Sequence, residues 1–222
     1  MTYDDVMARL EALGDPKVRK LNARNGAGEN QFGVKLGEIR TLGKEIKANP
    51  ELAAQLWNSG NQDAMLLATL LMKPALLSLA DLDRMVGGVT SPQVADWLAT
   101  QVVKLHPEKE ARRETWMNSP HAFTARMGWS LMTERVLKNP NGLDIGGILD
   151  RIEREMGSAP EVTQWTMNFC LAEIGIEFPE HRARAIAIGE KIGAFRDYPT
   201  SKGCTSPFAP IWIAELASRK GT

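Results

Sequence analysis

The sequence predicts an all-α fold, and three observations lead to that prediction. Apolar residues recur with a helical period in almost every segment of the 222-residue chain. No segment shows the strict alternation of polar and apolar residues that is typical of a half-buried strand. Prolines stand at the expected helix starts, where a missing backbone N–H costs nothing. The helices predicted in this way span residues 51–59, 93–105, 108–118, 121–138, 161–176 and 211–219.

A weak internal repeat indicates how these helices are arranged. Leu56-Trp57-Asn58-Ser59, at the end of one predicted helix, resembles Trp116-Met117-Asn118-Ser119 at the end of another, and a more apolar helix follows each. Helix pairs of roughly 35–45 residues cannot bury their apolar faces alone, so they stack on one another. We therefore predict one domain over residues 1–222, a HEAT-like or armadillo-type solenoid of stacked antiparallel helix pairs. Chance similarity between two helical segments is the alternative.

The charge of the chain is balanced overall but not locally. The totals are 27 Lys and Arg and 27 Asp and Glu. Residues 16–47 contain eight Lys or Arg against three Glu, and residues 181–222 contain seven against three Asp or Glu. Basic ends of this kind could hold a polyanion along one edge of a neutral protein. They could equally be ordinary solvated helix faces.

The composition narrows the class of protein. No apolar leader follows Met1, and the longest apolar runs are too short to cross a bilayer. Cys170 and Cys204 lie far apart and the three histidines are scattered. This pattern predicts free thiols, a cytoplasmic location, and no metal or other cofactor. Residues 22–33 and 198–210 are rich in Gly, Asn or Pro and are expected to be loops, which often carry function.

One predicted helix face is unusual for a core. On residues 93–105, an apolar stripe of Val and Leu is the expected buried face. A second stripe holds an aromatic residue, two amides and a cation, namely Gln93, Trp97, Gln101 and Lys104. A tryptophan in a helix is often simply a core residue, but these polar neighbours favour a binding face.

Two later helices show a similar mixture. Arg126 lies about one turn before Trp129, and Gln164 and Asn168 flank Trp165 on the next inner helix, with Glu173 further along. The inner helices of a solenoid line its concave surface, so we expect these residues to face a ligand. The structural alternatives are that Arg126 pairs with a neighbouring carboxylate and that Glu173 is a buried, hydrogen-bonded carboxyl group.

A resemblance to a known family adds to this interpretation. Residues 30–45, NQFGVKLGEIRTLGKE, resemble the opening motif of the AlkD-like DNA alkylation repair family, and the similarity extends at low identity to about Ile176. The resemblance implies a HEAT-like solenoid with a basic groove that holds duplex DNA. It also implies that active members remove cationic alkylated purines. Aromatic faces and a carboxylate would stabilise the positive charge that develops on the sugar.

The resemblance transfers only partly to individual residues. Trp97 matches a family tryptophan, but Gln101 stands where the family has an aspartate. A neutral amide cannot supply the same negative charge or act as a base. Arg126 matches a phosphate-binding arginine. The family's second tryptophan falls at or near Glu173, which could supply a carboxylate from the other side of the groove, and Trp165 lies two turns earlier.

These observations predict a protein of the alkylation-repair type that binds duplex DNA. Gln101 favours a divergent, non-catalytic member over one that excises alkylated purines. The candidate catalytic residues are Glu173, Trp97 and Gln101, and the candidate DNA-binding residues are Arg126, Trp129, Trp165, Asn168, Gln164, Lys104, Lys35 and Arg40. Two alternatives stay open. One is a helical-repeat adapter that binds a protein or peptide in its groove. The other is a small-molecule enzyme that uses Glu173, Gln164 and Asn168 in a closed pocket.

Overall fold

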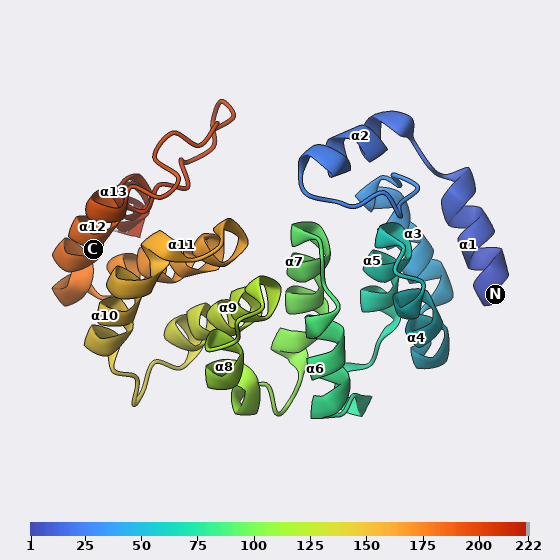
Figure 1. Ribbon diagram of the computed structural model, residues 1–222, viewed down its shortest axis with the longest axis horizontal. Helices are drawn as coiled ribbons and strands as arrows, with labels where there is room; N and C mark the ends of the chain where they lie inside the picture. The colour runs from blue at the N-terminus through green and yellow to red at the C-terminus, as the bar shows by residue number, and fades with distance from the viewer. Residues whose placement is uncertain (221–222) are drawn as a thin grey trace. The chain divides into compact units, whose positions relative to one another are not determined.

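The computed structural model describes residues 1–220 and confirms the all-α prediction (Figure 1). The side chain of Lys220, one of the basic residues counted near the C-terminus, lies outside the described residues. Within the described part, the β structure is one isolated bridge between Gly14 and Val34. No helix there is long and apolar enough to span a membrane. The chain divides into two compact units, Met1–Lys109 and Glu110–Thr222, and the expectation of a single domain stays a prediction.

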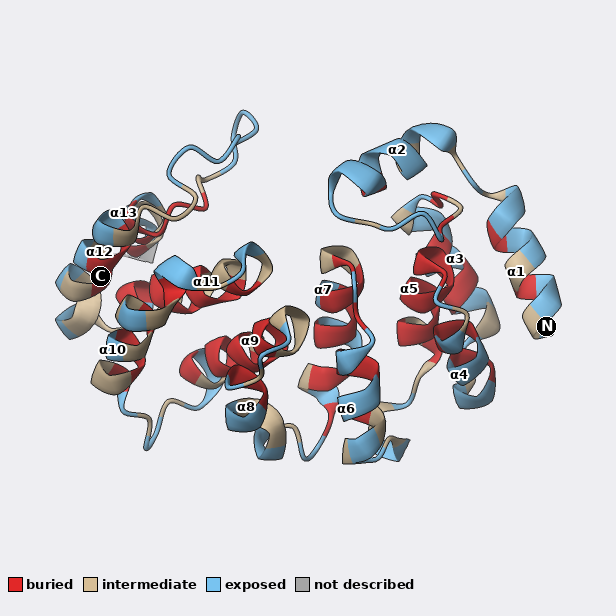
Figure 2. Cartoon of the chain, in the orientation of Figure 1, coloured by how far each residue is buried: buried red, intermediate tan, exposed pale blue. Residues whose placement is uncertain are grey.

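Unit 1 is built around α5. The hairpin of α4 and α5 is its centre, and α3 and α7 pack against α5, so that α5 is almost entirely buried (Figure 2). The helices of this unit are α1 (Tyr3–Ala12), α2 (Pro16–Arg24), α3 (Leu36–Ile46), α4 (Pro50–Asn58), α5 (Gln62–Leu71), α6 (Leu79–Gly87) and α7 (Pro92–Gln101), with short 3-10 helices at Pro74–Leu76 and Val103–Leu105.

Unit 2 is built around α9 and α11, which pack on each other. Helix α8 packs on α9, and α10, α12 and α13 pack on α11. A Cβ on Gly128 of α9 would lie 2.3 Å from the backbone nitrogen of Met117, so only glycine permits the close approach of α8. The helices of this unit are α8 (Glu110–Met117), α9 (Ala122–Lys138), α10 (Ile145–Glu155), α11 (Glu161–Glu177), α12 (Pro179–Ile192) and α13 (Ala209–Lys220), with a 3-10 turn at Met156–Ser158.

The predicted repeat corresponds to two helix hairpins. Trp57 in the last turn of α4 and Trp116 in the last turn of α8 are both buried, and α5 and α9 follow as the more buried partners. The predicted start of α4, residue 51, is correct to within one residue. Pro50 occupies its first position, and the side-chain oxygen of Asn49 accepts a hydrogen bond from the Leu52 N–H at 3.1 Å.

The helix predicted over residues 93–105 is wrong in its last turn. The backbone leaves the helical region at Val102, with φ −127° and ψ −66°, and continues as the 3-10 turn Val103–Leu105. The buried ring of His106 lies next, with Nε2 2.9 Å from the Leu77 carbonyl oxygen. Lys104 therefore does not continue the stripe of Gln93, Trp97 and Gln101.

Smaller boundary differences occur at other elements. Helix α8 begins at Glu110 rather than residue 108, after a turn. The predicted loop 22–33 starts later, because α2 continues to Arg24, and the loop 198–210 ends earlier, because α13 begins at Ala209. Proline at position 210 fits the first turn of α13 for the reason that applies at the other helix starts.

The two cysteines differ in accessibility, which gives a direct test of this fold. Burial raises the pKa of the Cys170 thiol to about 12, whereas Cys204 is exposed in the segment before α13. Because the thiolate is the nucleophile, we expect a disulfide-exchange reagent to modify one thiol per native chain and a second only after denaturation. Native Cys204→Ser protein should then show almost no reaction. Equal reactivity of both thiols in the native chain would contradict the packing of α11.

Candidate nucleic-acid interface

The opening motif of residues 30–45 folds around a buried carboxylate that the sequence analysis did not identify. The carboxylate of Asp63, in the first turn of α5, accepts hydrogen bonds from three successive backbone N–H groups. They come from Phe32 at 2.6 Å and from Gly33 and Val34 at 3.0 Å each. Asp63 has no exposed surface, and an acidic group is favoured at a helix N-terminus. The available signal was an aspartate in the first turn of a very apolar helix.

Glycine is required within this motif. Gly33 has a φ of +80°, and a Cβ there would lie 2.5 Å from the backbone nitrogen of Arg19. Its carbonyl oxygen accepts a hydrogen bond from the Asp15 N–H at 3.0 Å, just before α2 begins. The motif thus joins the first turn of α5 to the start of α2.

A layer of amide hydrogen bonds fixes the loop that precedes the motif. Asn22 of α2 donates to the side-chain oxygen of Gln31 at 3.1 Å, and Gln31 donates to the Gly28 carbonyl oxygen at 2.9 Å. Asn61 donates to the side-chain oxygen of Asn30 at 3.2 Å. The loop and the C-terminal half of α2 are therefore held to the turn between α4 and α5 by polar contacts rather than by a large apolar face.

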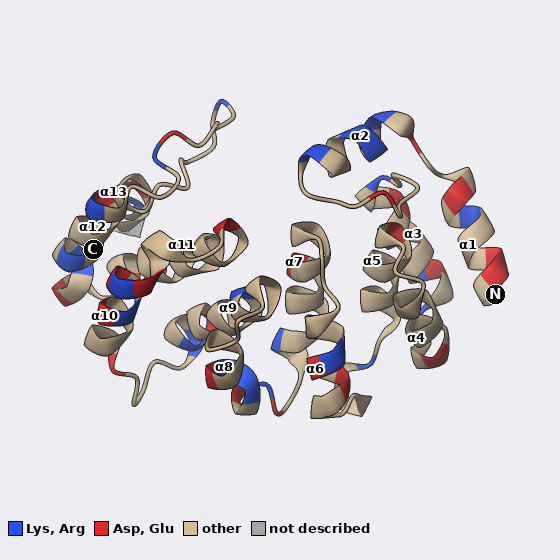
Figure 3. Ribbon diagram, in the orientation of Figure 1, with Lys and Arg blue, Asp and Glu red and all other residues tan. Residues whose placement is uncertain are grey.

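The exposed surface of α2 is strongly basic. Lys17, Lys20 and Arg24 are exposed and follow the i, i+3, i+7 spacing of one helix face. Helix α2 contains no acidic residue, and Figure 3 shows basic positions along it. Arg19, on another face, pairs with Glu29 at 3.2 Å. This face is the densest basic surface on a single helix of unit 1.

Two candidate residues of unit 1 form a stacked pair. The guanidinium of Arg40, on α3, lies 4.8 Å from the centre of the Trp97 ring, on α7. Arg40 is exposed, whereas Trp97 is only 9% exposed. This is a cation–π contact in which the cation covers the ring from the solvent side. Trp97 therefore presents little aromatic surface of its own.

The other candidates of unit 1 have separate placements. Gln101, the last residue of α7, is exposed one turn after Trp97. Gln93 accepts a hydrogen bond from the Gln62 amide at 3.0 Å. Lys35, immediately before α3, is exposed and lies 3.8 Å from an Asp15 carboxylate oxygen. Lys104 is half-buried in the 3-10 turn after α7.

Arg126 and Trp129 of α9 are buried in unit 2, which corrects the expectation that they project from an inner face. Arg126 is 4% exposed, and its Nη1 donates to the Val162 carbonyl oxygen of α11 at 2.8 Å. Trp129 is 1% exposed within the apolar core. In this structure Arg126 connects α9 to α11, and Trp129 fills the space between helices.

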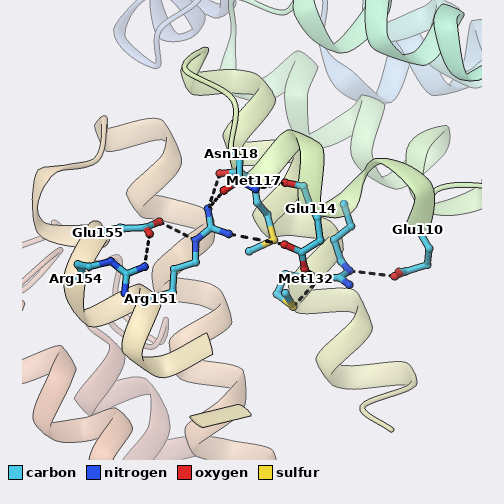
Figure 4. Close-up of polar contacts among 9 residues, drawn as sticks. Glu110, Glu114, Met117, Asn118, Met132, Arg151, Arg154 and Glu155 are labelled. Carbon is cyan, nitrogen blue, oxygen red and sulfur yellow. Dashed lines mark hydrogen bonds and ion pairs between the residues drawn. The ribbon is translucent and has the colours of Figure 1, made fainter. Parts of the chain in front are cut away.

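Further arginines of unit 2 also serve the packing of its helices (Figure 4). The guanidinium of Arg151, on α10, lies 5.3 Å from the Trp129 ring centre and donates to the Met117 carbonyl oxygen at 2.9 Å. It also donates to Asn118 and Glu155, both at 2.8 Å. These contacts join α8, α9 and α10. The positive charge of Arg151 is thus balanced within the unit.

The candidates on α11 are divided between loop contacts and an aromatic cluster. The amide of Asn168 is buried and donates to the Pro207 carbonyl oxygen at 2.7 Å, and the amide of Gln164 donates to the Gly157 carbonyl oxygen at 3.4 Å. Trp165 is half-buried against other rings. Glu173 is half-buried two turns further on. Both amides thus hold neighbouring segments, which does not support a small-molecule pocket formed with Glu173.

Helix pairs that stack on one another are the arrangement of a helical-repeat protein. The family model described as DNA alkylation repair enzyme matches residues 6–211. The chain therefore belongs to the DNA alkylation repair family.

Individual relatives are similar to the chain over nearly its whole length. A solved structure described as "a new family of proteins related to the HEAT-like repeat DNA glycosylases with affinity for branched DNA structures" is 28% identical to the chain. The match covers 99% of this chain and 95% of that one, with a TM-score of 0.81. Uncharacterized proteins of Listeria innocua and Listeria monocytogenes are 23% and 22% identical over 225 residues, which cover 99% of each chain. The HEAT-like fold prediction is confirmed.

The contacts of Asp63 predict a large effect on stability. Asp63→Ala leaves three buried backbone donors without their acceptor, which should lower the free energy of unfolding by about 3 kcal/mol or more. Asp63→Asn keeps one acceptor oxygen, so its free energy of unfolding should lie between those of Asp63→Ala and the wild type. Urea unfolding followed by circular dichroism measures both. Replacing Asp4, which is exposed in the first turn of α1, by alanine is the matched control, and an equal, small effect at both positions would contradict the assigned role.

The stacked pair can be tested by a double-mutant cycle. Arg40→Gln and Trp97→Leu, alone and combined, should show a coupling of about 0.5–1 kcal/mol in the free energy of unfolding, as expected for a partly exposed cation–π contact. Arg84, an exposed arginine of α6, provides a control cycle with Trp97 that should be additive. Additive effects of Arg40 and Trp97 would show that the two side chains do not interact in solution.

Proposed function

We propose that this protein binds DNA without excising bases. The observation that carries the proposal is the arrangement at α7, where the Arg40 guanidinium covers the Trp97 ring and the neutral Gln101 follows one turn later. At these positions of the family resemblance, Arg40 supplies a positive charge and Gln101 supplies a neutral amide. This arrangement suits a negatively charged partner.

The chemistry of base excision requires the opposite charge. Breaking the bond between a cationic purine and its sugar leaves positive charge on the sugar, which a nearby carboxylate and an open aromatic face stabilise. A guanidinium about 4 Å from such a centre would oppose it by several kcal/mol at the dielectric constant of a protein surface. With Gln101 in place of an aspartate, the position one turn after Trp97 carries no negative charge. The position therefore favours phosphate contact over glycosidic cleavage.

The charged surface of unit 1 supports DNA as the partner. Lys17, Lys20 and Arg24 line one face of α2, and Arg40 is exposed on α3. Exposed cations in such numbers displace condensed counterions from DNA, which provides sequence-independent affinity. The loop contacts described above hold α2 in place, so this basic face is presented by an ordered element.

The solved relative suggests which form of DNA is bound. That protein is described as having affinity for branched DNA structures. We extend this property to the present chain as part of the proposal. A helical-repeat adapter for a protein partner is the competing function, and a chain that binds neither plain nor branched DNA at low salt would favour it.

Binding should depend on Arg40 and on salt. Fluorescence anisotropy with a labelled four-way junction and a plain duplex should show affinity that falls steeply between about 50 and 200 mM salt. This fall is expected because each contact between a basic side chain and a phosphate releases a bound counterion. Arg40→Ala should weaken binding to both DNAs about five- to tenfold and reduce the salt slope by about one. The control is Arg84→Ala, because the Arg84 side chain is 72% exposed and pairs with Asp81.

The same preparations test the absence of excision. On methylated duplex DNA, we expect no release of methylated purine by the wild-type protein above the spontaneous rate. Release that disappears in Trp97→Ala would overturn the non-excising part of the proposal and leave DNA binding intact. Wild-type affinity of the Arg40→Ala variant for DNA would show that Arg40 does not contact the DNA.

A further inference from the structure

An aromatic cluster lies on unit 2, formed by α11, α13 and the segment between α12 and α13. Trp165 of α11 is its centre. The ring centre of Trp165 lies 5.6 Å from that of Phe169, 5.1 Å from that of Phe195 and 5.4 Å from that of Tyr198. Trp212 of α13 extends the cluster, 4.5 Å from Phe169. Two of these rings, Phe195 and Tyr198, belong to the segment between α12 and α13, to which the sequence analysis assigned no role.

The turn that carries Phe195 and Tyr198 is strained and firmly held. Phe195 has a φ of +62°, a conformation that bulky residues rarely adopt unless the surroundings impose it. The next residue, Arg196, has its guanidinium 4.5 Å from the Phe208 ring centre and pairs with Glu190 at 2.9 Å. The Tyr198 N–H donates to the Phe195 carbonyl oxygen at 3.2 Å. The turn at Phe195 thus places Tyr198 against Trp165.

The cluster is only partly covered. Trp165, Phe195 and Trp212 are half-buried, and Tyr198 is 44% exposed. Figure 1 shows the segment between α12 and α13 extending away from the ends of these helices. Aromatic surface that is rigid on one side and open to solvent on the other is a stacking platform for a flat ligand.

The charges near the platform favour a base over a phosphate. Asp197 adjoins Tyr198, and Arg196 is engaged by Glu190, so that Lys202 is the remaining exposed cation of residues 195–202. A nearly neutral aromatic surface binds the face of a nucleobase, and bases of every type present such a face. Bases within a continuous duplex are stacked on their neighbours, whereas a branch point exposes unstacked ones.

We propose that Trp165, Phe195 and Tyr198 form a stacking site for an unpaired or unstacked nucleobase at a DNA branch. The proposal rests on the proposed DNA-binding function and adds the part of the DNA that unit 2 contacts. Tyr198 supplies the exposed ring, and Trp165 and Phe195 pack against it. In this proposal the basic face of α2 and Arg40 contact the DNA phosphates, and the aromatic site contacts a base.

The test compares two tyrosine variants on two DNAs. Tyr198→Ala should weaken binding to a four-way junction about tenfold and leave binding to a plain duplex of equal length nearly unchanged, because one stacked base is lost. Tyr198→Phe should restore the wild-type affinity for the junction. A 2-aminopurine placed at the branch should be quenched by the wild type and the phenylalanine variant but not by the alanine variant.

A matched control is available because the chain contains two tyrosines. Tyr3 lies on α1 in unit 1 and is half-buried, and Tyr3→Ala should leave the preference for the junction unchanged. Equal affinities of Tyr198→Ala and wild type for the junction, or equal losses on both DNAs, would overturn the stacking site while DNA binding stands. A wild-type protein that binds neither DNA would overturn both this inference and the proposed function.

Discussion

The carboxylate of Asp63 is the group on which the N-terminal architecture depends. A charged side chain without exposed surface is tolerated only if hydrogen bonds replace the water it has lost. Three consecutive backbone N–H groups of residues 32–34 meet that requirement, and they can converge only because Gly33 adopts a left-handed conformation. This arrangement determines how the chain runs from the end of α2 to the start of α3. The motif that carries the family resemblance therefore has a structural role. By joining Asp63 to the start of α2, it positions the basic surface of that helix.

Charge is used differently in the two units. In unit 2, Arg126 and Arg151 are directed to backbone carbonyl oxygens and to Glu155, so that their charge connects helices. In unit 1, the cations of α2 are exposed along one face, and Arg40 covers an aromatic ring. A count of basic residues along the sequence does not separate these uses. The difference is one of solvation, because an arginine that is desolvated against a helix end is no longer available to phosphate.

The same kinds of side chain serve two distinct tasks in the proposed DNA complex. At α7 the aromatic ring is covered by a cation, which removes the open face that a cationic sugar or base would need. At the segment before α13 the aromatic surface is open and nearly neutral, which suits an uncharged base. An enzyme that excises cationic purines requires an open ring and negative charge at one point. Here the ring at α7 is covered and the open aromatic surface lies on unit 2, an arrangement consistent with holding DNA rather than excising its bases.

The sequence by itself determined the all-α class, the starts of the proline-marked helices to within two residues, the paired helices marked by Trp57 and Trp116, and the family. These features depend on local periodicity, proline positions and a contiguous motif, all of which are present within a few turns of chain. Tertiary structure alone decided which side chains are available. Asp63 meets residues about 30 positions earlier, Trp129 and Arg126 are enclosed by α10 and α11, and the helix break at Val102 removes Lys104 from the Trp97 stripe. Tyr198 reaches Trp165 only through the turn at Phe195. Helical spacing says which residues share a face, but the elements packed against that face decide whether it meets solvent.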